Sequence, residues 1–370
     1  MRTDIAIVHD YLNQRGGAER VVLTMARGFE GVPVYTAVYE PGSTFPEYAD
    51  VPIRVSWLDH VPGARRRHRA LLPFLAPTFS AWRVEADIVI CSSSGWAHGV
   101  RTEGRKIVYC YAPARWLYQT QRYLGDQGSV SRLVARGALA ALSPPLRAWD
   151  RAAAASADRY LAVSSETARA VAAAYGVEAE VLMPPIDLDP SLPMREVPGE
   201  QPGFWLCVSR LLPYKNVDAV LDGVERQGGR VVIVGSGPER ARLEARAGRF
   251  ARFLGSVDDE QLRWCYANCA GLIAAAYEDF GLTPLEAALF GRPTAALRAG
   301  GYLDTVIEGT TGWMFDAATG EQVAHALDRL ERTSFDGGVL ARQAQRFSAE
   351  SFLGRLREIA AEESSASGST

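Results

Sequence analysis

Two basic side chains stand close together in the second half of the chain, where an apolar run gives way to a helical pattern. Arg210 and Lys215 follow the apolar residues 204–209 and precede the amphipathic segment 217–227. A helix start offers free backbone N–H groups and a positive potential, so two cations beside it favour an anion such as a diphosphate. Lys215 is one of two lysines among 40 basic residues, and lysine binds phosphate as a compact point charge. A solvated loop with two surface cations is the alternative interpretation.

A second segment combines two glutamates with a glycine at the start of another helical pattern. Residues 277–288 read YEDFGLTPLEAA, which places Glu278 in a loop and Glu286 in the helix. Gly281 would let backbone amides face a ligand at the helix start. A carboxylate accepts hydrogen bonds from the neighbouring hydroxyls of a sugar or a ribose. Glu286 could equally be an acid that stabilises the start of its helix.

Glycine-containing turns follow two further strand-like runs. The sequence Gly235-Ser236-Gly237-Pro238 comes after residues 230–234, and Gly300-Gly301 comes after residues 294–297. Such turns allow the backbone to approach a ligand closely, but the first lacks the third glycine of a dinucleotide-binding fingerprint. A plain structural turn explains the first equally well.

The motifs need elements that carry them to one edge of a sheet. Strand-like runs and amphipathic helical stretches alternate along the chain, which predicts parallel, doubly wound α/β sheets. Such sheets bind ligands beyond the carboxyl ends of their strands, where the motifs lie. The expected strands are residues 5–8, 32–38, 88–91, 107–111, 160–163, 204–209, 230–234, 252–254, 272–276 and 294–297, and the expected helices include 130–141, 166–175, 217–227, 238–247, 258–269 and 284–290.

A proline-rich stretch divides this alternation in two. The length of 370 residues favours two domains, and proline cannot continue a helix or a central strand. We therefore expect a domain at 1–185, a linker at 186–203, a second domain at 204–347, a terminal helix at 348–363 and a disordered tail at 364–370.

The composition is that of a soluble, core-forming protein. Hydrophobic residues make up 48% and charged residues 22% of the chain. We find no stretch with the length and apolarity of a membrane-spanning helix or a signal peptide. The five scattered cysteines lack zinc or redox spacing. These features predict a cytoplasmic protein, and no motif indicates nucleic-acid binding.

In order and spacing, the motifs resemble the retaining glycosyltransferases of family four, whose two glutamates are spaced E-x7-E. The resemblance covers nearly the whole chain and is strongest in residues 204–315. It implies the GT-B fold, in which two Rossmann-like domains face each other across a cleft, with the acceptor domain first and the donor domain second. The matching motifs are Gly16-Gly17-Ala18-Glu19, Arg210-x4-Lys215, Gly235-Ser236-Gly237-Pro238, Leu254-Gly255-Ser256-Val257, Glu278-x7-Glu286, Gly291-Arg292-Pro293 and Gly300-Gly301.

The resemblance implies roles for individual residues. Arg210 and Lys215 would neutralise the donor diphosphate and the charge on the leaving nucleotide, and Glu278 would bind the transferred sugar, so these three would carry catalysis. Glu286 would accept hydrogen bonds from the ribose, and Val257 would lie near the base. Further donor contacts would come from Gly16, Gly17, Asp279, Phe280, Gly281, Leu282 and Thr283.

The implied reaction transfers a hexose, with mannose as the first expectation, from a nucleoside diphosphate sugar to a hydroxyl of a glycan or lipid-linked acceptor. Family members need no cofactor and no bound metal, and the leaving phosphate would accept the acceptor's proton on the same face of the sugar. The mannose expectation comes from Tyr109-Cys110-x-x-Pro113-x-Arg115, which is similar to members that use GDP-mannose. The alternatives are a sugar-nucleotide epimerase or phosphorylase of the same fold, or a nucleotide-sugar-binding protein without turnover.

The amino-terminal half departs from the family pattern at one position. Tyr111 stands where relatives often carry a histidine that contacts the donor sugar. A tyrosine hydroxyl can still donate or accept a hydrogen bond. Asp10 and His98 are candidate replacements for that histidine, with local structural hydrogen bonds as the alternative role for both.

A basic stretch lies beside an apolar one at residues 63–75, GARRRHRALLPFL. This combination can contact an anionic membrane, where related enzymes meet lipid-linked acceptors. Peripheral contact with the inner face of the membrane is therefore one expectation, and a charged, solvated helix start is the other.

Overall fold

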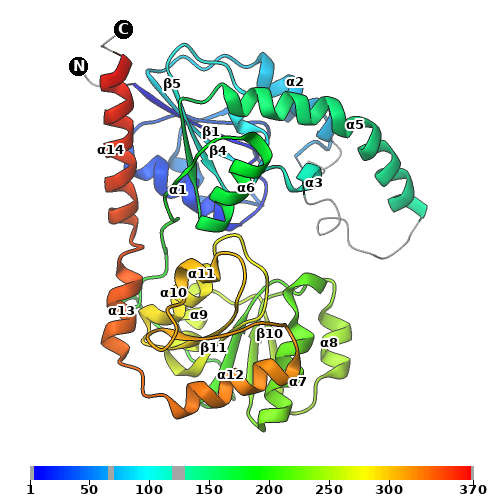
Figure 1. Ribbon diagram of the computed structural model, residues 1–370, viewed down its shortest axis with the longest axis vertical. Coiled ribbons are helices and arrows are strands. Elements are labelled where there is room, and N and C mark those ends of the chain that lie inside the picture. Colours follow the sequence, from blue (N-terminus) through cyan, green and yellow to red (C-terminus); the bar gives the residue numbers. More distant parts are fainter. Residues whose placement is uncertain (1–3, 66–70, 119–129, 368–370) are drawn as a thin grey trace. The chain divides into compact units, whose positions relative to one another are not determined.

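The chain folds into two compact units, each built around one parallel sheet (Figure 1). The computed structural model describes residues 4–65, 71–118 and 130–367. Unit 1 spans Met1–Pro184 together with Ala349–Thr370, and unit 2 spans Pro185–Ser348. The doubly wound α/β architecture predicted from the alternation of strands and helices is confirmed.

The sheet of unit 1 has seven strands in the order β3-β2-β1-β4-β5-β6-β7. Its order reverses between β1 and β4, and the carboxyl ends at such a reversal form the usual ligand crevice of these sheets. Residues of β4 and β5 are almost entirely buried, as expected for central parallel strands. The strands are β1 (Ile5–His9), β2 (Val34–Thr36), β3 (Ile53–Val55), β4 (Ile88–Ser93), β5 (Arg105–Cys110), β6 (Arg159–Ala162) and β7 (Glu180–Val181).

Helices connect the strands of unit 1, and local signals set their ends. The Ser164 side chain accepts a hydrogen bond from the Thr167 amide at the start of α6, and Gly176 ends that helix in the left-handed conformation with φ 70°. The helices are α1 (Gly17–Gly28), α2 (Leu72–Ala81), α3 (Arg115–Tyr118), α5 (Val130–Ala155), α6 (Ser165–Tyr175) and α14 (Ala349–Ser367), with 3-10 turns η1 (Pro46–Asp50), η2 (Trp57–His60) and η4 (Ala97–Gly99).

The sheet of unit 2 has six strands in the order β10-β9-β8-β11-β12-β13, with its reversal between β8 and β11. The strands are β8 (Phe204–Val208), β9 (Val231–Val234), β10 (Ala251–Gly255), β11 (Cys269–Ala274), β12 (Thr294–Leu297) and β13 (Gly312–Phe315). The helices are α7 (Val217–Gln227), α8 (Arg240–Arg246), α9 (Asp259–Asn268), α10 (Leu282–Leu289), α11 (Tyr302–Thr305), α12 (Gly320–Arg332) and α13 (Gly337–Gln345), with the 3-10 turn η5 (Pro213–Lys215).

The core of unit 2 lies on both faces of its sheet. Alternate strand residues point to opposite faces, so Trp205 and Cys207 join one buried cluster while Phe204 and Leu206 join the other. Helices α7 and α12 contribute to the first cluster, and α9 and α10 contribute to the second. Unit 2 therefore has three layers, with helices on both faces of the sheet. The loops that carry the predicted motifs follow the carboxyl ends of its strands.

The proline-rich segment is packed against unit 2. Residues 182–203, all of which the structure describes, contain no helix or strand. Arg263 Nε donates to the Pro193 carbonyl at 2.9 Å, Arg252 donates to the Pro198 carbonyl at 2.7 Å, and Val197 is buried in the unit 2 core. This segment therefore packs along the second unit and is held there by hydrogen bonds and by the buried Val197 side chain.

Two helices extend beyond their predicted ends. Helix α5 continues to Ala155, past the predicted segment 130–141, and α14 continues to Ser367. Residues 364–367 are therefore helical, which corrects the expectation of a disordered tail for this part, and residues 368–370 lie outside the described ranges.

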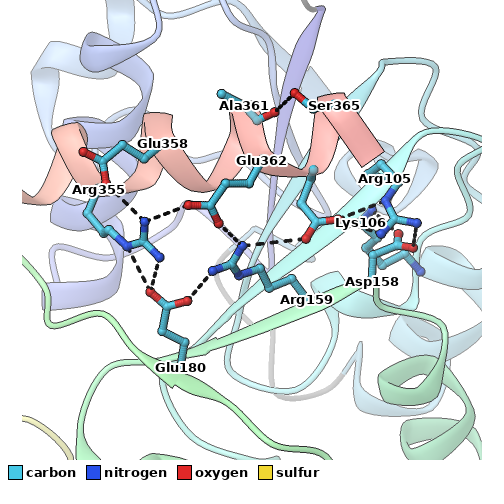
Figure 2. A network of polar contacts seen from close by, with 11 residues as sticks. Arg105, Lys106, Asp158, Arg159, Glu180, Arg355, Glu358, Ala361, Glu362 and Ser365 are labelled. Carbon is cyan, nitrogen blue, oxygen red and sulfur yellow. Dashed lines mark hydrogen bonds and ion pairs between the residues drawn. The ribbon is translucent and has the colours of Figure 1, made fainter. Parts of the chain in front are cut away.

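The last helix, α14, belongs to unit 1 and is joined to it by apolar and charged contacts. Its Phe352 ring packs edge-on against buried Tyr109 of β5, with ring centroids 5.6 Å apart. Figure 2 shows Arg159 of β6 between Glu180 and Glu362, with Arg355 reaching Glu180 from the helix. Arg355 Nη2 lies 2.8 Å from a Glu180 oxygen. An ion-pair network therefore fixes the carboxyl-terminal helix beside the strands that carry Arg159 and Glu180.

Candidate active site

The loops after β8 and β11 bring the two predicted motifs of unit 2 together. These strands are neighbours at the reversal of the sheet, so their carboxyl ends open onto the same edge. The Asn216 side chain joins the loops by donating from Nδ2 to the Ala275 carbonyl at 2.9 Å. Asn216 has a positive φ of 54° and leads directly into α7.

Lys215 is a buried cation held by a carboxylate. Its side chain is 7% exposed and forms an ion pair and hydrogen bond with Glu278. A buried ammonium without a partner is strongly unfavourable, so the pair fixes both groups. Arg210, in contrast, is exposed and donates from Nη2 to the Tyr214 hydroxyl at 3.3 Å. The loop therefore presents one fixed and one accessible cation.

Helix α10 begins directly beside this pair. Gly281 precedes the helix with φ 83°, and a Cβ at this position would lie 2.4 Å from the Tyr302 ring. Both the positive φ and the close ring require glycine. The first-turn amides of Leu282 and Thr283 have no partner within the helix and can face an anion.

The paired glycines after β12 have a structural role that the sequence left open. A Cβ on Gly300 would lie 2.1 Å from the Glu278 carbonyl, and one on Gly301 would lie 2.1 Å from the Phe280 carbonyl. The Gly301 amide donates to the Glu278 carbonyl at 2.8 Å. These glycines let the β12 loop support the loop that carries Glu278.

The turn at Gly235–Pro238 supports Arg210 in a similar way. A Cβ on Gly235 would lie 2.0 Å from the Ser209 carbonyl, and one on Gly237 would lie 2.2 Å from the Leu211 carbonyl. The Leu211 amide also donates to the Ser236 carbonyl at 3.0 Å. Close backbone packing accounts for the glycines, as the structural alternative anticipated.

Glu286 lies on α10 and makes a short hydrogen bond that the sequence did not reveal. Its Oε2 accepts from the Tyr266 hydroxyl of α9 at 2.6 Å. Burial raises the pKa of Glu286, the Tyr266 hydrogen bond lowers it, and Asp187 and Asp259 raise it, so the pKa lies above its usual value. The side chain keeps partial exposure. No spacing rule links Tyr266 to Glu286, because only the packing of α9 against α10 brings them together.

Three other predicted donor contacts differ in accessibility. The Phe280 side chain is buried, and its ring centroid lies 6.2 Å from that of Phe347. Phe280 can therefore contribute its backbone to a ligand but not its ring. Asp279 and Val257 are half-buried, and Val257 follows the edge strand β10.

In unit 1, the predicted glycine loop begins α1 directly after β1. Gly16 is the N-cap residue of α1, and Gly17 is its first helical residue. Buried Glu19 lies beneath this turn, and its Oε1 accepts from Gln14 Nε2 at 2.9 Å. His9 Nε2 lies 3.9 Å from Glu19 Oε1, and Glu19 Oε2 would touch a Cβ on Gly16 at 2.5 Å. The side chains of His9 and Glu19 therefore pack beside the glycine loop and support it.

Asp10 is a structural acceptor. It is 1% exposed and accepts hydrogen bonds from the amides of Ser94 at 2.7 Å and Ala97 at 2.7 Å. Burial raises the pKa of Asp10, although these amides and the nearby histidines lower it in part. Asp10 thus fixes the loop after β4 to the end of β1. These hydrogen bonds match the local structural role that is the alternative to sugar contact.

His98 is also internal, which corrects the expectation that it could contact a sugar. It is 1% exposed, with Nδ1 2.8 Å from Ser93 Oγ and Nε2 3.0 Å from Asp150 Oδ1. Serine, histidine and aspartate also form the triads of hydrolases, but all three residues are buried here. The set can hold α5 to the loop after β4, and it offers no surface to a substrate.

Tyr111 is the third candidate sugar contact in unit 1. It follows β5, is partly exposed, and donates from its hydroxyl to the Ala18 carbonyl at 3.2 Å. The same hydroxyl accepts from Ser92 Oγ at 3.0 Å. Tyr111 is therefore joined to the first turn of α1, and its hydroxyl already has two partners.

The basic stretch predicted to contact a membrane falls mostly on residues 66–70, which lie outside the described residues. Its described neighbour Arg65 forms an ion pair with Asp59, with Nη2 2.6 Å from Oδ2. Within the described ranges, no helix combines the length and the apolar composition needed to cross a membrane.

Comparison with known proteins identifies the family, because one family model matches most of each unit. Residues 15–190 match the family model "Glycosyltransferase Family 4", and residues 193–348 match "Glycosyl transferases group 1". The Anabaena protein Alr3699/HepE, solved in complex with UDP, is 17% identical, with a TM-score of 0.71 over 97% of this chain and 100% of that chain. The chain belongs to the glycosyltransferases of the GT-B fold.

Other proteins that this GT-B glycosyltransferase resembles are a mannosyltransferase, a glycogen synthase and a sucrose-phosphate synthase. The human alpha-1,3/1,6-mannosyltransferase ALG2 is 25% identical over 349 residues, which cover 81% of this chain and 80% of the relative. A glycogen synthase of Pseudomonas aeruginosa is 34% identical over 142 residues, or 36% of this chain and 27% of the relative. Sucrose-phosphate synthase of Thermosynechococcus elongatus has a TM-score of 0.71 at 17% identity, over 99% of this chain and 100% of that chain.

Proposed function

We propose that this glycosyltransferase moves mannose from GDP-mannose to a hydroxyl of a glycan or lipid-linked acceptor, with retention of the anomeric configuration and without a bound metal. The observation that carries the donor part is the ion pair of buried Lys215 with partly exposed Glu278, beside exposed Arg210 and the start of α10. Cations and oriented amides that act on developing charge in a partly buried site stabilise a departing diphosphate.

In this proposal, each group of unit 2 has a distinct task. Lys215 and Arg210 balance the charge of the diphosphate, and the Leu282 and Thr283 amides bind its oxygens. Glu278 accepts from sugar hydroxyls while it holds Lys215. Glu286 accepts from the ribose. The acceptor's proton passes to the leaving phosphate oxygen on the same face of the sugar.

The choice of mannose is supported by likeness to the ALG2 mannosyltransferase and by the Tyr109–Arg115 motif. The donor is tested by incubating the protein with UDP-, GDP- and ADP-sugars and measuring binding and slow donor hydrolysis. GDP-mannose is expected to be bound and hydrolysed fastest. Preference for another nucleotide sugar would replace the mannose assignment, and binding of none would refute the nucleotide-sugar site.

Retention and metal independence need separate measurements. Product formed on an acceptor is examined by proton NMR, and retention predicts the anomeric configuration of the donor. Activity after dialysis against EDTA is expected to stay within about twofold of the untreated enzyme. An inverted product, or activity that returns only with a divalent ion, would contradict the respective part of the proposal.

A membrane-bound acceptor is supported by apolar side chains next to the basic stretch. Trp57 is 56% exposed and Phe74 is 51% exposed, with ring centroids 6.5 Å apart. Aromatic rings beside basic residues favour the interface of an anionic bilayer. We expect the protein to float with vesicles that contain phosphatidylglycerol, and Trp57→Ser with Phe74→Ser to abolish flotation. Equal flotation of this double variant would contradict this contact.

A further inference from the structure

Tyr266 is completely buried at the junction of α9 and α10. It is 0% exposed, and its ring stacks on Phe290 with a centroid distance of 5.8 Å and an interplanar angle of 13°. Its hydroxyl reaches the Glu286 carboxylate at 2.6 Å. A phenol enclosed in this way cannot contact a ligand, so its hydroxyl can act only through its neighbour.

Glu286 depends on this single donor. Among the residues that the structure describes, Tyr266 is its one hydrogen-bond partner, and no Lys or Arg pairs with it. The nearby charged groups are Asp187 and Asp259, which have the same sign. A half-buried carboxylate without a cation has no other group to set its rotamer or to stabilise its charge.

We propose that Tyr266 is a positioning residue for the donor site: its hydroxyl fixes Glu286 so that the remaining carboxylate lone pairs face the ribose diol of the nucleotide. This inference rests on the proposed donor function and deepens it. An ionised carboxylate has about four lone-pair sites, and Tyr266 occupies one of them. The remaining sites can accept hydrogen bonds from two hydroxyls at once only if the carboxylate is held in one orientation. A fixed Glu286 therefore favours a ribose with its 2′,3′-diol over a sugar that lacks this diol.

The test compares two ligands in two proteins. UDP, GDP and ADP are titrated calorimetrically into the wild-type enzyme, and the diphosphate that binds best is compared with its 2′,3′-dideoxy form. Tyr266→Phe removes only the hydroxyl and keeps the stacked ring. It is expected to weaken the ribonucleotide about tenfold and to leave the dideoxynucleotide within twofold. A general structural role would instead weaken both ligands equally.

Two further variants keep the test independent of folding defects. Glu286→Asp shortens the side chain, so that it cannot reach Tyr266 and the ribose together, and it should lose the same preference for the diol. Tyr160→Phe makes the identical change at another buried tyrosine, which lies in the hydrophobic core of unit 1 and in none of the donor motifs. This control should change neither affinity.

The outcomes separate the two proposals. If the wild type binds a diphosphate but Tyr266→Phe or Glu286→Asp keeps the full preference for the diol, the positioning role is wrong and the donor site stands. Equal weakening of both ligands by Tyr266→Phe also overturns the positioning role. If the wild type binds none of the three diphosphates, the donor site itself is refuted, and the role of Tyr266 with it.

Discussion

Lys215 and Glu278, on the loops that follow the neighbouring strands β8 and β11, form an ion pair between a buried ammonium and a partly exposed carboxylate. The pair connects the two motifs that the sequence places 63 residues apart. It also sets the state of the site before a donor arrives, because the ammonium is already oriented and largely removed from water. A preorganised charge costs little reorganisation when new negative charge develops on a leaving phosphate.

Replacing Lys215 is therefore expected to affect turnover more than donor binding. Lys215→Ala should lower kcat about 100- to 1,000-fold while donor affinity falls less, because the cation acts on charge that grows in the transition state. Lys215→Arg should restore little activity, since a planar guanidinium does not fit a buried ammonium site. Steady-state kinetics with donor titration check both variants.

The second lysine supplies the matched control. Lys106 is also buried, and its Nζ donates to the His98 carbonyl at 3.2 Å and to Ser156 Oγ at 2.8 Å in unit 1. Lys106→Met should keep kcat within about twofold once folded, because both hydrogen-bond partners of this ammonium lie in unit 1, outside the donor motifs of unit 2. Equal loss of kcat in both variants would argue against a special role of Lys215.

His98 is expected to matter for stability and not for sugar transfer. His98→Ala removes two buried hydrogen bonds and leaves the Asp150 carboxylate without its histidine, so the free energy of unfolding should fall by about 3 kcal/mol. Denaturant unfolding measures this loss. Activity per folded molecule, determined at low temperature, should remain within about twofold. A large fall in kcat/KM with unchanged stability would restore the sugar-contact hypothesis.

The contrast between His98 and Lys215 shows what the sequence could and could not reveal. Lys215 follows a strand and precedes a helix, and this local pattern is enough to place it at a strand's carboxyl end. The role of His98 depends on Asp150, which is 52 residues away. No local spacing distinguishes a histidine that faces a ligand from one that faces a buried carboxylate.

The same distinction applies to the fold: elements with a clear local pattern were predicted, and short strands without one were missed. The segment 217–227 matches α7 because its apolar residues recur with helical spacing and face the core. Strands β3, β7 and β13 were missed because they have two to four residues and no clear alternation. Pairing with neighbouring strands defines them, and this pairing is tertiary information.

Donor binding should depend on pH through Glu286. Because its pKa is raised by burial, Glu286 gains a proton as the pH falls toward that value, and a protonated carboxyl is a poorer acceptor for ribose hydroxyls. Affinity for a nucleoside diphosphate sugar should therefore fall with decreasing pH in the wild type. In Glu286→Gln it should be weaker and independent of pH over the same range. Calorimetric titration at several pH values checks this, and a wild-type slope retained in Glu286→Gln would contradict it.

The same group should cost stability at neutral pH. The folded state binds a proton at Glu286 more tightly than the unfolded state, so its contribution to stability declines as the pH rises from the unfolded pKa through the folded one. Glu286→Gln keeps an oxygen that can accept from Tyr266 but carries no charge. Its Tm at neutral pH is expected to exceed that of the wild type, and the difference should shrink in acid. A lower Tm at neutral pH would contradict this expectation.

The network around α14 should make unit 1 sensitive to salt. Arg159, with 22% exposure, contacts carboxylates of both β7 and α14. Arg159→Met is expected to lower the free energy of unfolding by about 1–2 kcal/mol at low ionic strength, and less in 1 M salt. The matched control is Arg83→Met, where an exposed arginine of unit 1 pairs with the exposed Glu103. It should change stability by at most about 0.5 kcal/mol, and equal effects in both variants would contradict the network.

Because α14 belongs with the residues up to Pro184, the first unit is assembled from two segments that the second unit separates in the sequence. A ribosome completes that unit only when it has made α14, after the whole of the second unit. Expressing the first half alone would leave Tyr109 without Phe352 against its ring, and the two halves cannot be separated by a single cut. An isolated amino-terminal unit would need α14 supplied in trans or grafted after Pro184.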